Sequence, residues 1–78
     1  MVHIISVQAA EGGWSVTSSG ADNEMMFLSG AKAEFAARRL GENLAADGQT
    51  AEIRIFLRDG AQAGRFICAP RPDLAIAG

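Results

Sequence analysis

Four of the seven positions in the first strand-like segment, residues 2–8, are β-branched apolar residues, and they fall on both faces of a strand. A strand of that kind is covered on both faces, or on one face with the other at an interface. After the glycine pair Gly12 and Gly13, apolar and polar positions alternate, which is typical of a half-buried strand that forms a hairpin with the first. The positions of this second strand are Trp14, Ser15, Val16, Thr17 and Ser18.

The next apolar segment is short. Residues 18–23 are a cluster of turn-forming types, and residues 24–28 are mostly apolar. They predict a turn followed by an optional third strand.

A helix is predicted over residues 30–46, which are rich in alanine and contain no proline. The Ser29 hydroxyl can cap its first turn, and Asp47 with Gly48 supplies the end signal. Gly41 costs about 1 kcal/mol relative to alanine inside a helix, and a close approach to the sheet would explain it. The apolar stripe at helical spacing consists of Ala33, Ala36, Ala37, Leu40 and Leu44.

Alternation returns after the helix, over residues 50–58, and predicts a strand. A turn over residues 59–64 leads to a last strand over residues 65–69, which Pro70 ends. We therefore expect an α+β fold of the order β-β-(β)-α-β-β. Its antiparallel sheet has four or five strands, and one helix packs on one face. The predicted sheet side of the core is Trp14, Val16, Ile53, Ile55 and Leu57, packed against the helical stripe.

Length and composition limit the protein to one domain, residues 1–69, with a tail over residues 70–78 that is extended or partly disordered, although Leu74 and Ile76 could dock. A chain of 78 residues is marginal as a monomer. A single cysteine allows no internal disulfide, so self-association is the remaining common way to stabilise a domain of this size. No long apolar run predicts a membrane span or a signal peptide, so we expect a cytoplasmic protein. The net charge of −2 opposes general binding to nucleic acid.

The chain also resembles a known family in its hairpin. His3 in an early apolar strand, the segment 13–16 (Gly-Trp-Ser-Val), the alanine-rich helix and the segment 58–60 (Arg-Asp-Gly) before a last strand carry the resemblance. Over residues 2–69 the chain is similar to domain-of-unknown-function family 2188, small and mostly bacterial proteins with a hairpin, a helix and a second hairpin. The chain departs from the family in lacking a proline near the end of the first strand, in its acidic charge and in a longer last turn. The resemblance implies a fold and no catalytic activity.

No residue set predicts catalysis, a cofactor or a metal site. His3 is the only histidine and Cys68 the only cysteine, and both lie in strand-like segments where a structural role is expected. The carboxylates are scattered without the spacing of a calcium loop. The glycine pair precedes a strand, so no helix N-terminus is available to hold a phosphate. We therefore predict a protein that is not an enzyme.

Two surfaces are candidate interfaces. The first is the outer sheet face with Arg54, Phe56 and Arg58, joined by Arg65 or Phe66. Arginines interleaved with aromatics can clamp single-stranded nucleic acid, although arginine and aromatic residues are also enriched in subunit contacts.

The second surface is the outer face of the helix. A rotation of 100° per residue places Phe35 about 200° from Ala33, among Arg38, Arg39 and Glu42. The sequence predicts a homodimer or a module that binds another protein. The alternative is a single-stranded nucleic-acid binder that uses the sheet face.

Overall fold

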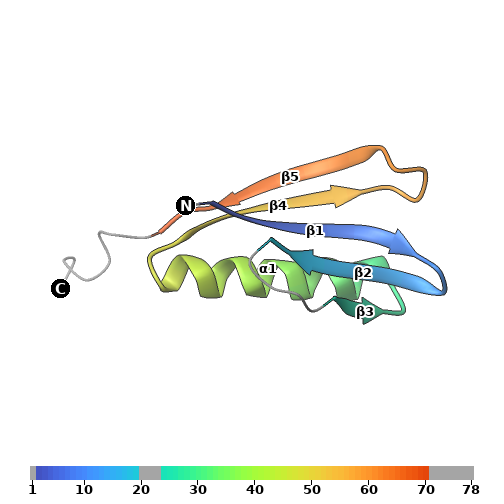
Figure 1. The fold of residues 1–78 in the computed structure, drawn as a ribbon, viewed down its shortest axis with the longest axis horizontal. Helices are drawn as coiled ribbons and strands as arrows, with labels where there is room; N and C mark the ends of the chain where they lie inside the picture. Colours follow the sequence, from blue (N-terminus) through green and yellow to red (C-terminus); the bar gives the residue numbers. More distant parts are fainter. Residues whose placement is uncertain (1, 20–23, 71–78) are drawn as a thin grey trace.

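One helix and a five-stranded sheet make up the computed structural model, which describes residues 2–19 and 24–70 (Figure 1). In chain order the elements are β1 (Val2–Ala10), β2 (Gly13–Ser18), β3 (Met25–Phe27), α1 (Gly30–Ala46), β4 (Thr50–Phe56) and β5 (Gln62–Cys68). The predicted α+β class and the element order are confirmed, including the third strand. Residues 71–78 of the predicted tail (70–78) and residues 20–23 of the predicted turn (18–23) lie outside the described residues.

The sheet is mixed, so the prediction of a wholly antiparallel sheet is wrong in one pair. The strand order is β3-β2-β1-β4-β5, and β1 and β4 run parallel with Ile5 opposite Ile53. The other three pairs are antiparallel. The reason is the direction in which each element carries the chain. Because β3 runs antiparallel to β2, α1 begins near the end of the sheet where β1 ends. The helix then returns the chain along the sheet, so β4 begins at the end where β1 begins.

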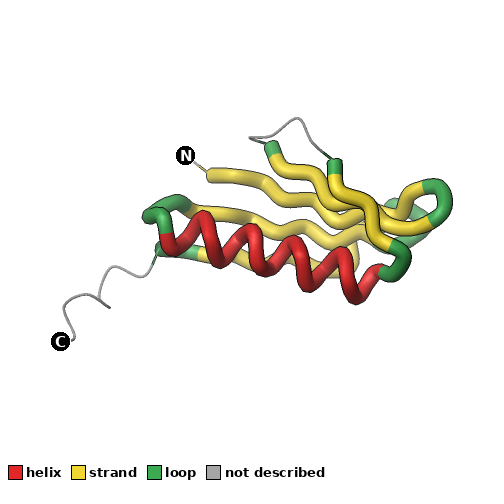
Figure 2. The backbone as a smooth tube through the Cα atoms, turned by 90° about the horizontal axis from the view of Figure 1, so that it is seen from below, coloured by secondary structure: helices red, strands yellow, loops and turns green. Residues whose placement is uncertain are grey.

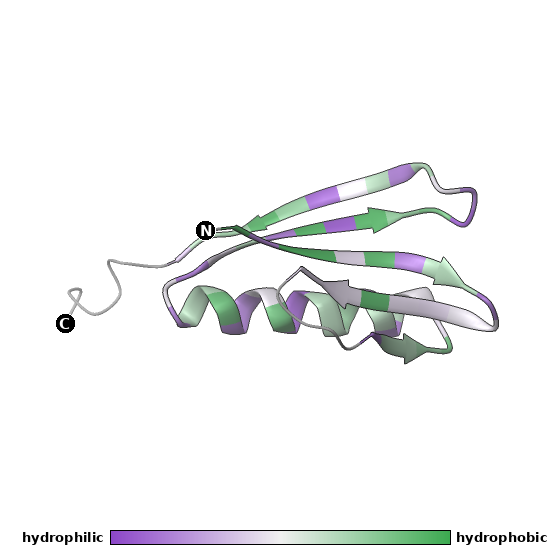
Figure 3. Ribbon diagram, in the orientation of Figure 1, coloured by the Kyte–Doolittle hydropathy of each residue, from purple (hydrophilic) through white to green (hydrophobic). Residues whose placement is uncertain are grey.

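Helix α1 covers one face of the sheet (Figure 2). Strand β1, at the centre of the sheet, is mostly apolar, whereas apolar and hydrophilic positions alternate along its neighbour β4 (Figure 3). On the helix side, the positions near the middle of both strands are fully buried, as at Val7 and Ile53. No described element packs against the opposite face, which we call the uncovered face. Its side chains include Ile4, Ser6, Gln8, Ser15, Thr17, Glu52, Arg54, Phe56, Arg65 and Ile67.

The core is small. Its fully buried apolar residues are Ile5, Val7, Val16, Ala33, Ala37, Ala51 and Ile53, and the residues packed around them are Trp14, Phe27, Leu40, Leu44, Ile55 and Cys68. Most of the predicted core is confirmed. Leu57 is the exception: its side chain is 50% exposed because β4 ends at Phe56 and Leu57 begins the turn. Ala36 is half-buried at the margin of the helix–sheet contact.

The helix begins and ends at the predicted residues. The Ser29 hydroxyl accepts a hydrogen bond from the Lys32 amide at 3.1 Å, and Gly48 ends the helix with a φ of 85°. Gly41 is buried where the helix approaches the sheet. A Cβ at this position would lie 2.8 Å from the Cys68 sulfur and 3.1 Å from Cδ1 of Ile53. The close approach inferred for Gly41 is therefore confirmed.

The second hairpin is longer on its return strand than predicted. Strand β5 begins at Gln62, three residues earlier than expected, with a register shift opposite Ile55 and Phe56. The Leu57 amide donates to the Ala61 carbonyl at 2.7 Å, and the Asp59 carboxylate accepts from the Ala61 amide at 2.9 Å. The turn itself is thus short, and a bulge absorbs the extra residue.

Candidate functional site

A polar row crosses the uncovered face at mid-sheet. Ser6 of β1 lies beside Arg54 of β4, which lies directly opposite Arg65 of β5. Thr17 of β2 extends the row on the other side of Ser6. Two guanidinium groups and two hydroxyls therefore lie in one line across four strands, and this is the most basic part of the described sheet surface.

Glu52 partly neutralises this row. Its carboxylate accepts from Arg54 Nε at 2.6 Å and lies 4.0 Å from Arg65 Nε. The Glu52 side chain is only 13% exposed. The hydrogen bond from Arg54 lowers the pKa of Glu52, against the opposing effect of burial, and the charges of Arg54 and Arg65 lower it further. Like charges directly opposite in a sheet destabilise it, so this carboxylate stabilises the Arg54–Arg65 pairing.

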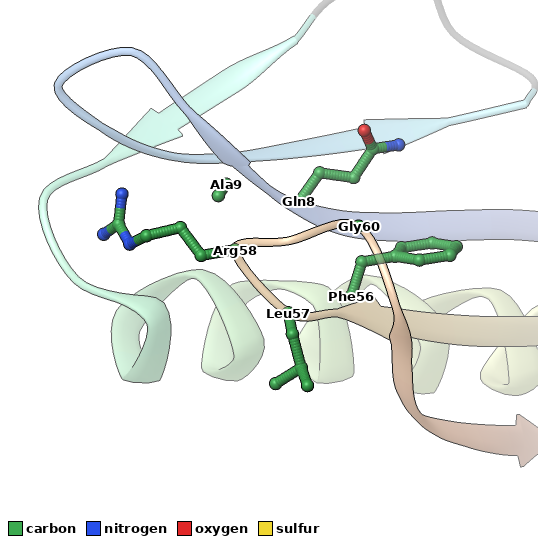
Figure 4. A pocket seen from close by; sticks show the side chains of 6 residues that line it. All are labelled: Gln8, Ala9, Phe56, Leu57, Arg58 and Gly60. Atoms are coloured by element: carbon green, nitrogen blue, oxygen red, sulfur yellow. The ribbon is translucent and has the colours of Figure 1, made fainter.

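Phe56 lies one row further along β4 and is half-buried. It lines a shallow pocket of about 240 Å³ together with Gln8, Ala9, Leu57, Arg58 and Gly60 (Figure 4). Sites for small molecules are usually larger, at about 300–1,000 Å³, and enclose their ligand. The pocket therefore does not indicate a small-molecule site.

The structure does not bring Arg58 onto the face that Arg54 and Phe56 share. Strand β4 ends before Arg58, and its guanidinium lies 5.3 Å from the ring of Trp14, which packs on the helix side of the sheet. Arg65 takes the place expected of Arg58, opposite Arg54. Phe66 points to the helix side, because it lies opposite the buried Ile53.

On the outer face of α1 the predicted exposure of Phe35 is confirmed: its side chain is 63% exposed. The Arg39 guanidinium lies 6.0 Å from its ring. Arg38 does not join them. It pairs with Glu34 at 2.9 Å and lies over the ring of Phe66, 4.3 Å from its centroid. Arg38 therefore belongs to the β5 edge of the molecule.

The only histidine and the only cysteine lie in one row on the helix side of the sheet, with Ala51 between them. The strand spacing of about 4.8 Å separates their backbones by about 10 Å. A ring nitrogen of His3 hydrogen-bonds the side-chain oxygen of Gln49, and the Cys68 sulfur packs against Gly41. Within residues 2–19 and 24–70, neither side chain contacts a partner that would make it a base or a nucleophile.

Two further findings concern the described residues alone. They contain no group of three or more histidine, cysteine, aspartate or glutamate residues that could hold a metal ion. No helix among them is long and apolar enough to cross a membrane.

Sequence reasoning missed the outer edge of β5. The alternation of residues 62–68 is interrupted by Gly64, so the predicted strand began only at Arg65. The contact between Arg38 and Phe66 joins the helix to this edge and has no local sequence signal. One feature of the sequence was compatible with an earlier start of this strand: residues 62–64 contain no proline and no charged residue.

Comparisons with protein-family models, with curated proteins and with solved structures gave no match in any of the three. The resemblance to domain-of-unknown-function family 2188 therefore stays a prediction.

Proposed function

We propose that this protein is a non-enzymatic interaction domain that works as a homodimer. One observation carries the proposal. Among the described residues, four large apolar side chains are fully buried, whereas eight are exposed. Burial of apolar area is the main favourable contribution to folding and to most protein association. A domain of this size buries little apolar area by itself, so leaving eight such side chains exposed is costly. A second copy would bury part of the exposed set.

The exposed apolar residues gather at the two sheet edges. Met25, Met26 and Leu28 lie on or next to β3, and Phe66 and Ile67 lie on β5. The three that remain are Val2, Phe35 and Leu57. Phe35 is the only one of the eight on the outer face of the helix, so the helix face is the weaker of the two interfaces proposed from the sequence.

The test is the mass of the protein in solution, measured by light scattering and sedimentation equilibrium over a range of concentrations. We expect a dimer at about hundreds of micromolar, as suits an interface of modest area. Phe35→Glu and Phe56→Glu, made separately, report on the helix face and on the uncovered face. A wild-type protein that stays monomeric at the highest concentration would refute the proposal.

The second candidate function is binding of single-stranded nucleic acid on the uncovered face. The observation that favours it is the direct opposition of Arg54 and Arg65, with Phe56 in the next row. Glu52 offsets one of these charges, and one aromatic residue offers a single stacking platform. We therefore expect no tight binding that is independent of base sequence.

A fluorescence titration with a labelled oligonucleotide at about 150 mM salt tests this candidate. The expected result is no submicromolar affinity. Submicromolar binding that Arg54→Ala and Arg65→Ala abolish together, and that Arg39→Ala leaves unchanged, would make nucleic-acid binding the better proposal.

A further inference from the structure

We infer that the outer edge of β5 pairs antiparallel with β5 of a second copy across a two-fold axis, so that two five-stranded sheets join into one. The inference rests on the proposed function, because it names the surface through which the homodimer forms. The two helices would then lie on the same face of the joined sheet.

The first step is the state of the two sheet edges. β5 is the outermost strand and has seven residues, whereas the other edge strand, β3, has three. No described strand pairs with the outer side of β5. An edge strand directs the amide and carbonyl of every second residue away from its sheet, and these groups can pair with another extended chain.

The second step is the absence of most protective features from β5. Proteins protect long edges with proline, lysine, inward charges or bulges. Residues 62–68 contain no proline and no lysine. The bulge lies at the Gln62 end, and the register from Gly64 to Cys68 is regular. Phe66 and Ile67, which are 39% and 54% exposed, point to opposite faces of this regular part.

The third step is the register that a two-fold axis allows. An axis at Arg65 would place two guanidinium groups directly opposite each other, which destabilises a sheet pair. An axis at Phe66 instead pairs each Arg65 with Ile67 of the other copy and each Gly64 with Cys68 of the other copy. It also places the two Phe66 rings beside each other, where aromatic pairs are favourable.

The fourth step is the choice of occupant. The strand that pairs here must offer apolar side chains on both of its faces and no cation opposite Arg65. A second β5 meets these conditions in the register centred on Phe66, where its Ile67 lies opposite Arg65. Pairing of β5 with β3 of another copy is a heterologous contact, which leads to rings or open polymers rather than to the isologous pair of a two-fold dimer.

The test compares two lysine substitutions of apolar residues with similar exposure. In the inferred register, Ile67→Lys faces Arg65 of the other copy, and the symmetry makes this repulsion occur twice. We expect the dimer dissociation constant to rise about tenfold or more. Val2→Lys is the matched control, because Val2 is 51% exposed but lies on β1. We expect it to leave the constant unchanged.

Two further variants test the register itself. Adding Arg65→Glu to Ile67→Lys places opposite charges across the axis, and we expect it to restore the dimer. With oxidised glutathione as the oxidant, Gly64→Cys should form a disulfide with Cys68 of the second copy, giving a covalent dimer that Cys68→Ser prevents. Antiparallel partners lie within the Cα separation that a disulfide needs, about 4.4–6.8 Å.

The outcomes separate the inference from the proposed function. A dimer that Ile67→Lys leaves intact and Phe35→Glu dissociates refutes pairing through β5 and retains the homodimer. A monomeric wild type refutes both. Species that grow beyond two copies with concentration indicate β5–β3 contacts and refute the closed pair. Unchanged circular dichroism of each lysine variant shows that the fold is retained.

Discussion

Gly41 is the position where the structure makes the sharpest prediction about stability. Replacing it with alanine adds a Cβ that would lie 2.8 Å from the Cys68 sulfur and 3.1 Å from Cδ1 of Ile53. Overpacking of this kind costs about 1–3 kcal/mol. The higher helix propensity of alanine returns about 1 kcal/mol. We expect Gly41→Ala to destabilise the protein by about 1 kcal/mol, or roughly 4–8 °C in Tm for a domain of this size.

The cause of that loss can be isolated with Cys68→Ala. After the sulfur is removed, the Cβ of residue 68 remains at an ordinary van der Waals distance of 3.5 Å from the new Cβ. The one tight contact left is Cδ1 of Ile53, at the end of a flexible side chain that can give by a few tenths of an ångström. On the Cys68→Ala background, we expect Gly41→Ala to be neutral or stabilising. The coupling between the two substitutions should be about 1–2 kcal/mol, within the range found for residues in contact.

Urea and thermal unfolding, followed by far-ultraviolet circular dichroism at one fixed protein concentration, measure these changes. The difference in stability between Glu42→Gly and Glu42→Ala gives the helix-propensity difference between glycine and alanine in this helix. Glu42 is next to Gly41 and exposed, so these two substitutions have no packing effect. If Gly41→Ala stabilises the protein by the amount found at Glu42, the close approach carries no cost and the reasoning fails. An equal loss in both backgrounds would show that the sulfur is not the limiting contact.

Two further predictions concern Glu52 and the core margin. The pKa of Glu52 is lowered in the folded protein, so its stabilising effect is complete above its ordinary value of 4.5 and is lost as the pH falls through the folded value. Between about pH 6 and about pH 3 we expect the urea midpoint of the wild type to fall more than that of Glu52→Gln, and parallel curves would contradict this. Leu40→Ala should cost about 2 kcal/mol, the lower end for a core leucine, because Leu40 is only partly buried. Leu57→Ala should cost less than about 1 kcal/mol in the same assay, and the reverse order would contradict the burial described for the two leucines.

Local signals in the sequence predicted the elements well. Ser29 and Gly48 mark the helix ends through capping and a positive φ, both of which act within one turn. The exposure of Phe35 follows from helical rotation alone. These features are determined by residues that are close together in the chain, so they can be predicted from the local sequence.

The parallel pairing of β1 with β4 could not be predicted in the same way. It depends on β3, a strand of three residues that the sequence predicts only as optional. With β3 present, the chain reverses its direction once more before the helix, and the direction of β4 is reversed as a result. The placement of Arg58 depends likewise on a single event, the end of β4 at Phe56, after which Arg58 turns toward Trp14.

Arg38 and Arg39 were both predicted to lie at one interface with Phe35, and only the tertiary contacts of the structure distinguish them. Arg38 and Arg39 are adjacent on the helix, yet one contacts Phe66 and the other Phe35. A helical wheel places both near Phe35, because it does not include the strand that lies beside the helix.

The parallel β1–β4 pair also has a consequence for how the chain folds. β1 leaves the ribosome well before β4, its parallel partner, which begins only at Thr50, after the whole helix. Contacts between such distant segments slow folding, because the loop between them must close first. Until then, the β1 edge of the early β1–β2 hairpin is unpaired. The rate of folding should therefore depend on how soon α1 forms and brings β4 alongside, and substitutions in the helix should change that rate more than substitutions in the β4–β5 turn.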